Sequence, residues 1–439
     1  MKRHIDMFLL NWKESPSHKP LLLRGARQTG KTFAIEALGK KFESYLSINF
    51  EKNPSFKQLF EADLDADRIV RDLSSSTGTK ITSGSTLLFF DEIQNCPKAI
   101  TALRYFYEQF PALHVIGAGS LLDFALEKIS IPVGRVEFLY FRPLSFKEYL
   151  TAAGKPGLLE AIENADLEKP VSAPIHAALL AQLKIYCFFG GMPGVLKRLI
   201  EENNPVAAQN ELEDIISTYR NDFSKYMGRT DPDVLHRTFD ALPRCIGRKV
   251  TYSKIDPEAR AFEVKKAIDL LEKARVIHKV RSTGGTGLPL AAGASDKHFK
   301  TIFLDVGLLQ RLAGYRYEDW LHQPDLVSAY EGAIAEQFAG QELAQAEGFL
   351  RNPGLFFWER NKPSSTAEID YLIALHGRII PVEVKAGGTG RLKSLKLFLN
   401  EHPSAGPGIK LSEENFGKSA FLATIPLYAG SELERIIRI

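Results

Sequence analysis

The chain has 439 residues, enough for about three domains of ordinary size and for more than one buried core. Hydrophobic residues make up 44% and charged residues 25%, which excludes wholesale disorder and a small disulfide-stapled protein. With 56 Lys+Arg against 53 Asp+Glu the formal net charge is only +3, so a surface for nucleic acid would have to be local.

Cysteine usage and hydropathy indicate the compartment. Cys96, Cys187 and Cys245 lie far apart and form no CxxC pair, which argues against a paired zinc site and indicates a reducing environment. Asn11 and Lys13 interrupt the N-terminal apolar run, and no stretch of about 18 apolar residues follows. We therefore expect a cytoplasmic chain that does not enter a membrane.

Up to residue 150, short apolar runs alternate with helical patterns, as a mostly parallel sheet covered by helices requires. Each run leads within about two residues to Gly, Glu, Asp or Pro, where the carboxyl end of a strand opens into a loop. Residues 1–150 are therefore predicted to form a doubly wound α/β domain. Its predicted strands are Pro20–Arg24, Tyr45–Phe50, Thr86–Phe90, Leu113–Gly117 and Val136–Phe141.

Residues 151–230 turn helical, because Ile175–Phe189 and Asn210–Tyr226 carry apolar residues at spacings of three and four. In residues 231–312 the order is a short strand at Val250–Ile255, an amphipathic helix at Ala261–Ala274, a strand at 276–280 and a glycine-rich turn. This order predicts a winged-helix-like region, although a loop-rich linker would have a similar pattern.

The remainder, residues 313–439, has the pattern of a second α/β domain. Two helices and three strands are expected there: Tyr330–Ala344, Phe356–Glu359, Ile369–Leu375, Ile379–Val384 and Leu392–Leu399.

A phosphate-binding loop is the strongest motif. Residues 25–32 read GARQTGKT, a complete G-x-x-x-x-G-K-[ST] match between an apolar strand and a helical run. The glycines permit backbone angles that turn N–H groups toward a phosphate, and the following helix directs its positive end at the same anion. Lys31 would reach the β- and γ-phosphates, and Thr32 would ligate Mg²⁺. We expect ATP or ADP to bind at Gly25, Ala26, Arg27, Gln28, Thr29, Gly30, Lys31, Thr32 and Phe33.

The segment STLLFFDEIQ supplies the second half of such a site. It is an apolar strand that ends in Asp91 and Glu92. Opposite a phosphate-binding loop, Asp91 can hold the water shell of Mg²⁺, and Glu92 can polarise the attacking water. Hydrolysis of ATP therefore has a candidate base.

Two weaker candidates follow. Ser120, after the apolar strand HVIGAG, could contact the γ-phosphate or the attacking water, although a simple turn serine would look the same. Arg135 could supply positive charge to the transition state, within the chain or in a neighbouring subunit of an oligomer. Most isolated arginines are merely solvated.

A charged constellation lies near the C-terminus. Asp370 stands at the start of one apolar run, and Glu383 and Lys385 stand at the end of the next. Residues i and i+2 share a face of a strand, so Glu383 and Lys385 project together, and a tight hairpin can bring Asp370 beside them. Asp370 and Glu383 could hold a divalent metal while Lys385 activates the water that attacks a phosphodiester. Glu336, in a helical pattern, is a fourth candidate.

The same constellation has a plainer reading. Alternating acids and bases are normal on a solvated strand face, and carboxylates beside a lysine can persist as a salt-bridged element of the fold. Around it lies a local basic run that could bind the phosphate backbone of a nucleic acid, comprising Arg378, Lys385, Arg391, Lys393 and Lys396.

Eight segments together resemble a family, the prokaryotic AAA-type P-loop ATPases fused to a C-terminal domain of unknown function with a restriction-endonuclease-like fold. They are, in order, GARQTGKT, LLFFDEIQ, the GAGS turn, GRVEFLYFRPLSFKEYL, FFGGMP, LDVGLL, EIDYLI and VEVKAG. The resemblance covers nearly the whole chain. It implies an ATPase core in which Glu92 is the base beside Asp91, Ser120 is sensor-like and Arg135 belongs to the GR that follows. Ala118 departs from the family, which more often has Thr there.

For the C-terminal part, the resemblance implies a fold related to PD-(D/E)XK nucleases, with Asp370, Glu383 and Lys385 at core positions. We expect either an ATPase whose C-terminal domain cuts or binds nucleic acid, or a signalling or scaffold ATPase whose C-terminal domain is an interaction module. A nucleotide kinase is less favoured, because the sequence shows no clear phosphate-acceptor pocket or basic lid.

Overall fold

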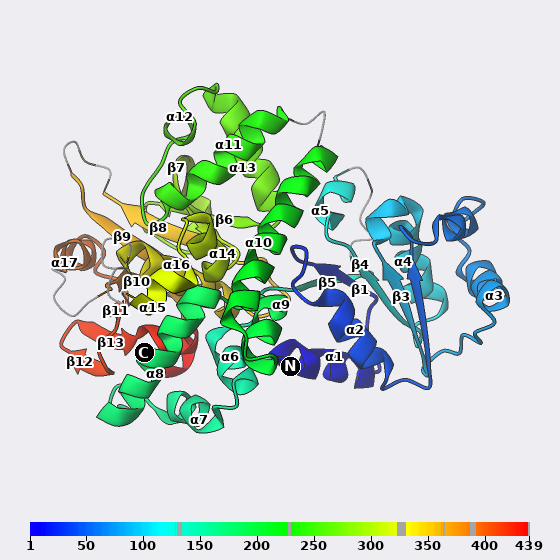
Figure 1. Cartoon of the computed structure of the whole chain (residues 1–439), viewed down its shortest axis with the longest axis horizontal. Helices are drawn as coiled ribbons and strands as arrows, with labels where there is room; N and C mark the ends of the chain where they lie inside the picture. Colours follow the sequence, from blue (N-terminus) through cyan, green and yellow to red (C-terminus); the bar gives the residue numbers. More distant parts are fainter. Residues whose placement is uncertain are drawn as a thin grey trace. The chain divides into compact units, whose positions relative to one another are not determined.

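The computed structural model describes residues 1–127, 129, 134–226, 230–322, 331–360, 362, 365–386 and 392–437. The chain forms two compact units, which can be followed by sequence colour in Figure 1. Unit 1 comprises Met1–Arg142 with two short later segments, Lys273–Arg275 and Gly348–Asn352. Unit 2 comprises Pro143–Glu272, Val276–Glu347 and Pro353–Ile439.

Unit 1 is built on a five-stranded sheet in the order β2-β3-β4-β1-β5, and every pairing in it is parallel. The predicted strands lie within one or two residues of the observed ones, so the α/β prediction for this part is confirmed. The elements are α1 (His4–Glu14), β1 (Leu21–Arg24), α2 (Lys31–Gly39), β2 (Ser44–Asn49), α3 (Ala66–Thr77), β3 (Thr86–Asp91), α4 (Pro97–Gln109), β4 (His114–Ala118), α5 (Leu122–Ala125) and β5 (Glu137–Tyr140).

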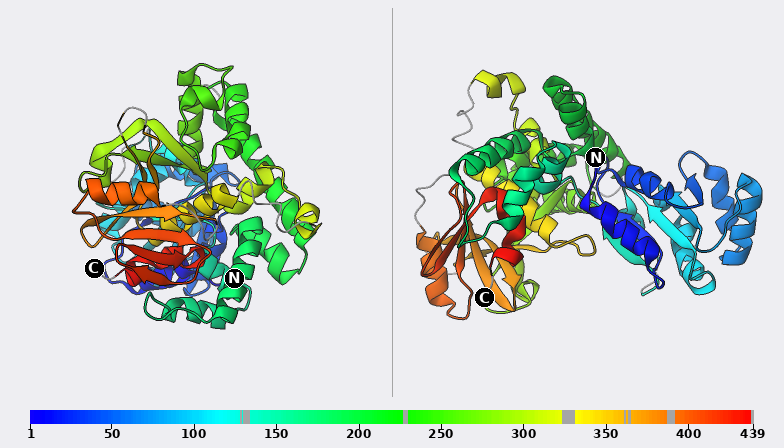
Figure 2. Two further views of the ribbon diagram at one scale, coloured as in Figure 1. Left: turned by 90° about the vertical axis from the view of Figure 1, so that its left-hand side faces the viewer. Right: turned by 90° about the horizontal axis from the view of Figure 1, so that it is seen from below.

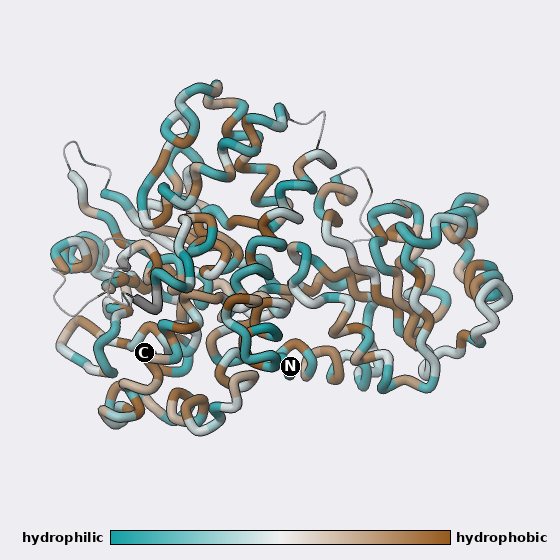
Figure 3. The backbone as a smooth tube through the Cα atoms, in the orientation of Figure 1, coloured by the Kyte–Doolittle hydropathy of each residue, from teal (hydrophilic) through white to brown (hydrophobic). Residues whose placement is uncertain are grey.

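Both faces of this sheet are buried, which is why its strands are apolar throughout instead of alternating. Leu21 and Leu23 point to the face that α1 and α2 cover, whereas Leu22 points to the face that α3 and α4 cover. In β3, Phe89 and Phe90 divide in the same way. Figure 3 shows the resulting run of hydrophobic colour through the strands of unit 1.

Unit 2 begins with helices and continues into an eight-stranded sheet, ordered β12-β13-β11-β10-β9-β8-β6-β7. Figure 2 shows the later strands of this sheet, in orange and red, lying side by side. The helices are α6 (Phe146–Ala152), α7 (Pro156–Asn164), α8 (Ala173–Phe189), α9 (Pro193–Leu196), α10 (Pro205–Asp222), α11 (Pro232–Ala241), α12 (Tyr252–Ile255), α13 (Ala261–Lys273), α14 (Val306–Leu312), α15 (Tyr317–His322), α16 (Glu331–Ala346), α17 (Lys393–Glu401) and α18 (Leu433–Ile436). The strands are β6 (Ile277–Thr283), β7 (Ala294–Phe303), β8 (Leu355–Glu359), β9 (Glu368–Leu375), β10 (Arg378–Val384), β11 (Gly408–Ser412), β12 (Gly417–Ser419) and β13 (Leu422–Pro426).

The hairpin β6–β7 joins this sheet, because β6 pairs in parallel with β8. The sequence reading put a boundary at residue 312, whereas the strands on either side of it belong to one sheet. The paired residues, such as Val280 and Leu355, lie 75 positions apart in sequence, so no local pattern reveals the pairing.

The strand predicted at Val250–Ile255 is wrong. Only Val250 pairs, in an isolated bridge to Phe299, and Tyr252–Ile255 forms the helical turn α12 that buries Ile255. Across the part of the chain that the structure describes, no helix is long and apolar enough to cross a membrane.

Candidate functional site

The phosphate-binding loop joins β1 to α2, as the motif predicts. Gly30 directly precedes the first turn of α2. Its φ is 87°, a backbone conformation that residues other than glycine rarely adopt. Gly25 passes so close to Phe141 that a Cβ there would collide with its backbone. The loop is braced from within, because the buried Thr29 hydroxyl donates to the Ala26 carbonyl at 3.0 Å.

Lys31 turns back into its own loop. Its Nζ donates to the carbonyls of Gly25 and Ala26, each at 2.8 Å, and its side chain is buried. Burial lowers the pKa of Lys31 to about 8, against the raising effect of Glu92 and Asp91. A phosphate in the loop would give this ammonium a closer counter-charge than it now has.

Asp91 and Glu92 stand at the carboxyl end of β3, as predicted. Both Asp91 oxygens are held: Oδ2 accepts from Asn49 Nδ2 at 2.9 Å, and Oδ1 accepts from the Glu92 N–H at 3.1 Å. Glu92 itself has a φ of 48° and receives a hydrogen bond from the Gln94 side-chain amide. Gln94 was not singled out from the sequence, although it is the last residue of DEIQ.

Ser120 belongs to the same edge. It follows β4, which lies between β3 and β1, and the register Leu23↔Ala118 sets it level with the start of the phosphate-binding loop. Its Oγ is buried and has no hydrogen-bond partner within the described ranges. Because a buried hydroxyl without a partner is costly, this orphan fits a site that a phosphate oxygen or a bound water completes.

These positions fit a nucleotide with Mg²⁺. The loop amides and Lys31 would hold the phosphates, and Thr32 and Asp91 would hold the metal. Thr32 and Phe33 are both exposed in the first turn of α2.

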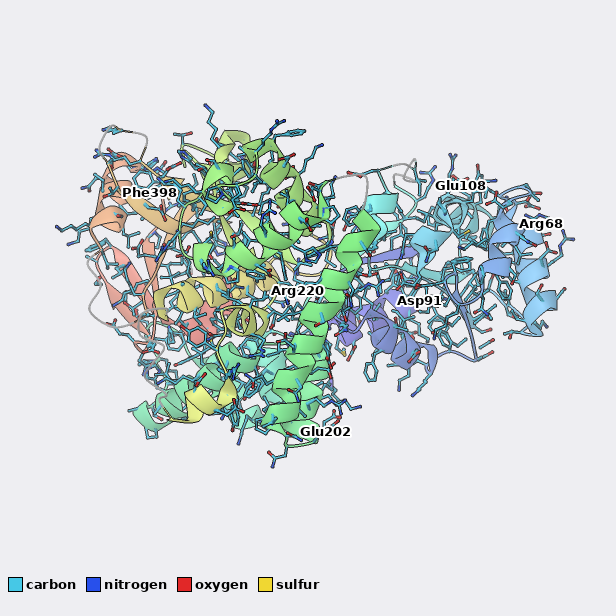
Figure 4. The ribbon with its side chains drawn as sticks, turned by 45° about the horizontal axis from the view of Figure 1, so that its top comes forward. Arg68, Asp91, Glu108, Glu202, Arg220 and Phe398 are labelled. Carbon is cyan, nitrogen blue, oxygen red and sulfur yellow. The ribbon has the colours of Figure 1, made fainter. Side chains whose placement is uncertain are left out.

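Arg135 lies elsewhere. It precedes β5, whose first N–H, that of Glu137, donates to Pro20 just before β1. Arg135 therefore sits at the amino edge of the parallel sheet, about 15 Å of strand away from the phosphate-binding loop. Its Nε bonds Glu108 at 3.0 Å, and Figure 4 shows Glu108 well apart from Asp91. This position argues against a role at the site of its own chain; a role in a neighbouring subunit stays a prediction.

In unit 2 the structure brings the C-terminal constellation together. Asp370 lies on β9 and its Oδ2 accepts the N–H of Val384, at 2.8 Å, so it is next to Glu383. Lys385 Nζ bonds Glu383 at 2.6 Å. The turn between β9 and β10 is the predicted two-residue hairpin, with positive φ at His376 and Gly377.

Two further members of this cluster, Lys300 and Glu368, were not predicted from the sequence. Lys300 lies on β7 and its side chain is only 1% exposed. Its Nζ bonds Glu336 at 2.8 Å, Glu368 at 2.5 Å and Asp370 at 3.3 Å. Burial alone would lower the pKa of Lys300, but the surrounding carboxylates outweigh it and raise the pKa well above its ordinary value. For the carboxyl groups burial acts in the opposite direction, and it raises the pKa of Glu336 and that of Glu383.

The metal prediction does not find support in this geometry. Within the described residues, no three or more His, Cys, Asp or Glu side chains are grouped so that they could hold a metal ion. The centre of the carboxylate cluster is taken by the Lys300 ammonium. Arg391, in the predicted basic run, lies outside the described residues, while Arg378, Lys393 and Lys396 are exposed.

Two of the motifs that carry the family resemblance, FFGGMP and LDVGLL, meet at a buried carboxylate. Asp305 accepts N–H groups from Gly191 at 2.6 Å, Gly307 at 3.0 Å and Leu308 at 3.2 Å. A side chain at Gly190 would collide with Asp305. Burial raises the pKa of Asp305 to about 6, although these N–H groups oppose the rise. The motifs therefore have a structural role in unit 2.

Comparison with protein-family models divides the chain into three segments. Residues 17–150 match an AAA domain, residues 180–319 match a domain of unknown function (DUF8612), and residues 331–429 match another (DUF4143). No curated protein matches the chain.

Solved structures with similar folds are distant. A Walker-type ATPase of Pyrococcus abyssi is 15% identical with a TM-score of 0.44, over 71% of this chain and 95% of that one. A signal-transduction ATPase with a tetratricopeptide-repeat sensor, from Pyrococcus horikoshii, is 12% identical with a TM-score of 0.28, over 78% and 47%. Drosophila ORC bound to DNA is 12% identical with a TM-score of 0.28, over 71% and 94%.

At such low scores these likenesses carry no argument about function, and the assignment depends on the domain match and the site. The AAA match spans the parallel sheet, the phosphate-binding loop and the acidic end of β3. The N-terminal part of this chain is an AAA-type P-loop ATPase domain.

Proposed function

We propose that the chain binds ATP with Mg²⁺ and hydrolyses it slowly. One observation carries the proposal: Lys31, the Asp91–Glu92 pair and the orphan Ser120 hydroxyl stand at the same edge of one sheet, at the ends of three neighbouring strands. Ligands of open α/β sheets bind at the carboxyl ends of the strands.

In this proposal each group has one task. Lys31 leaves the loop carbonyls for the β- and γ-phosphates, and the loop amides hold the remaining oxygens. Glu92, which Gln94 orients, accepts the proton of the attacking water, while Ser120 donates to the γ-phosphate or to that water. Mg²⁺ bound with the nucleotide neutralises charge on the phosphate oxygens.

The test is nucleotide binding by the full chain, measured by isothermal titration with ATP and Mg²⁺. Lys31→Ala should lose measurable binding. Lys40→Ala is the matched control, because Lys40 is exposed at the other end of the same helix. If Lys31→Ala binds ATP as tightly as the unaltered chain, the proposed site is wrong.

For the C-terminal region we propose contact with nucleic acid. Arg378, Lys393 and Lys396 support it, because each is exposed and cations at a surface favour a phosphate backbone. Binding of DNA or RNA that weakens steeply with salt, and weakens further in Lys393→Ala and Lys396→Ala, is the expected result. Salt-independent or absent binding would favour the alternative, a signalling or scaffold ATPase with an interaction module.

A further inference from the structure

The Lys300 side chain occupies the middle of the carboxylate cluster in unit 2. Its Nζ reaches carboxylates from two elements: Glu336 on α16, and Glu368 and Asp370 on β9. Glu368 and Asp370 are at positions i and i+2, so they share a face of their strand. One ammonium thus receives three carboxylates, and carboxylates are the side chains that a hard divalent cation prefers.

The remaining groups of the cluster are also largely engaged. Asp370 Oδ2 accepts the Val384 N–H, and Glu383 Oε1 accepts from Lys385. Glu383 Oε2 is buried with no hydrogen-bond partner in the described part of the chain. A metal within bonding distance of Glu336 and Asp370, about 2.0–2.6 Å, would stand beside the Lys300 ammonium. The two positive charges would repel each other strongly in this buried place.

We infer that Lys300 is a built-in cation that takes the place of a divalent metal, so that the cluster joins β7, α16 and β9 and does not cleave phosphodiesters. This inference concerns only the C-terminal region; ATP binding and hydrolysis by unit 1 do not depend on it. The nucleic-acid contact proposed above would then be binding without cleavage.

The test is Mn²⁺ binding by the full chain without nucleotide. Binding is measured by calorimetry and by the electron paramagnetic resonance signal of free Mn²⁺. The unaltered chain and Asp370→Asn should give the same titration, because neither holds Mn²⁺ at this cluster. Lys300→Gln, which removes the charge and keeps much of the length, should gain Mn²⁺ affinity at least about tenfold, and Asp370→Asn in that background should abolish the gain.

Two results would overturn the inference. One is Mn²⁺ binding by the unaltered chain that Asp370→Asn removes, a comparison that stays decisive even if Lys300→Gln fails to fold. The other is a folded Lys300→Gln chain with no gain in Mn²⁺ affinity, since Lys300 would then not be what excludes the metal. Metal-dependent cleavage of DNA or RNA by the unaltered chain, lost in Asp370→Asn, would contradict it as well.

Discussion

Nucleotide affinity should fall in mildly alkaline solution, because burial lowers the pKa of Lys31 to about 8 in the free protein. A polyphosphate beside the ammonium favours the protonated form, so the pKa of Lys31 should rise when nucleotide binds. Above pH 8, binding must then include the uptake of a proton by Lys31. Below pH 8 the proton is already present, and affinity should be nearly independent of pH.

The magnitude follows from one titrating group. If only the protonated form binds, affinity at pH 9 should be about tenfold weaker than at pH 7, or about 1.4 kcal/mol. Proton uptake on binding should rise from about 0.1 at pH 7 to about 0.9 at pH 9. Phosphate groups titrate near pH 6 and add little in this range.

Titration calorimetry with ADP at pH 7, 8 and 9, in two buffers of different ionisation enthalpy, measures affinity and proton uptake together. Lys31→Arg is the control, since a guanidinium stays charged throughout; any binding it retains should not change with pH. Constant affinity from pH 7 to 9 with no proton uptake would refute the reasoning.

Four further predictions concern single residues. Burial lowers the pKa of His114, which stacks on His18, to about 4. The neutral form therefore stabilises unit 1 above pH 6.5, and the free energy of unfolding in urea should fall by about 2 kcal/mol by pH 5. A free energy of unfolding that does not change between these pH values would contradict this. Asp305→Ala leaves three N–H groups without their acceptor and should cost about 3 kcal/mol, with Asp305→Asn milder; equal stability of all three chains would remove the structural role. Gln94→Ala should lower kcat for ATP and leave nucleotide Kd unchanged, because Gln94 only orients Glu92; an unchanged kcat would dismiss that role. If Arg135 acts across a subunit boundary, ATP hydrolysis per chain should rise with protein concentration. A monomer whose specific activity is constant would exclude that role and leave Arg135 a structural role through its bond to Glu108.

The ATPase domain could be predicted because its sequence signals are local. Strands buried on both faces, such as Leu21–Arg24, appear as unbroken apolar runs, and the motif fixes both the loop and the helix after it. The position of Arg135 was harder to predict. Its distance from Lys31 depends on which end of β5 lies beside the phosphate-binding loop, and a single sequence does not reveal that.

The C-terminal cluster could be predicted only in part. Period-two spacing and a tight hairpin brought Asp370, Glu383 and Lys385 together, as expected. Lys300 could not be foreseen, because it lies seventy residues before Asp370 in a hairpin that the sequence assigned to another domain. Its one signal is a lysine inside an apolar strand, in HFKTIF, a pattern typical of an exposed lysine on an edge strand. β7 is indeed an edge strand, but the Lys300 side chain is buried.

Hydrolysis itself tests the central claim most directly. Single-turnover conversion of ATP to ADP and phosphate should be about 10²–10⁴-fold slower in Glu92→Gln than in the unaltered chain, because a general base contributes that much. ATP binding should be retained, and Glu36→Gln, an exposed change on α2, should have no effect. Equal hydrolysis by Glu92→Gln and the unaltered chain would contradict the account.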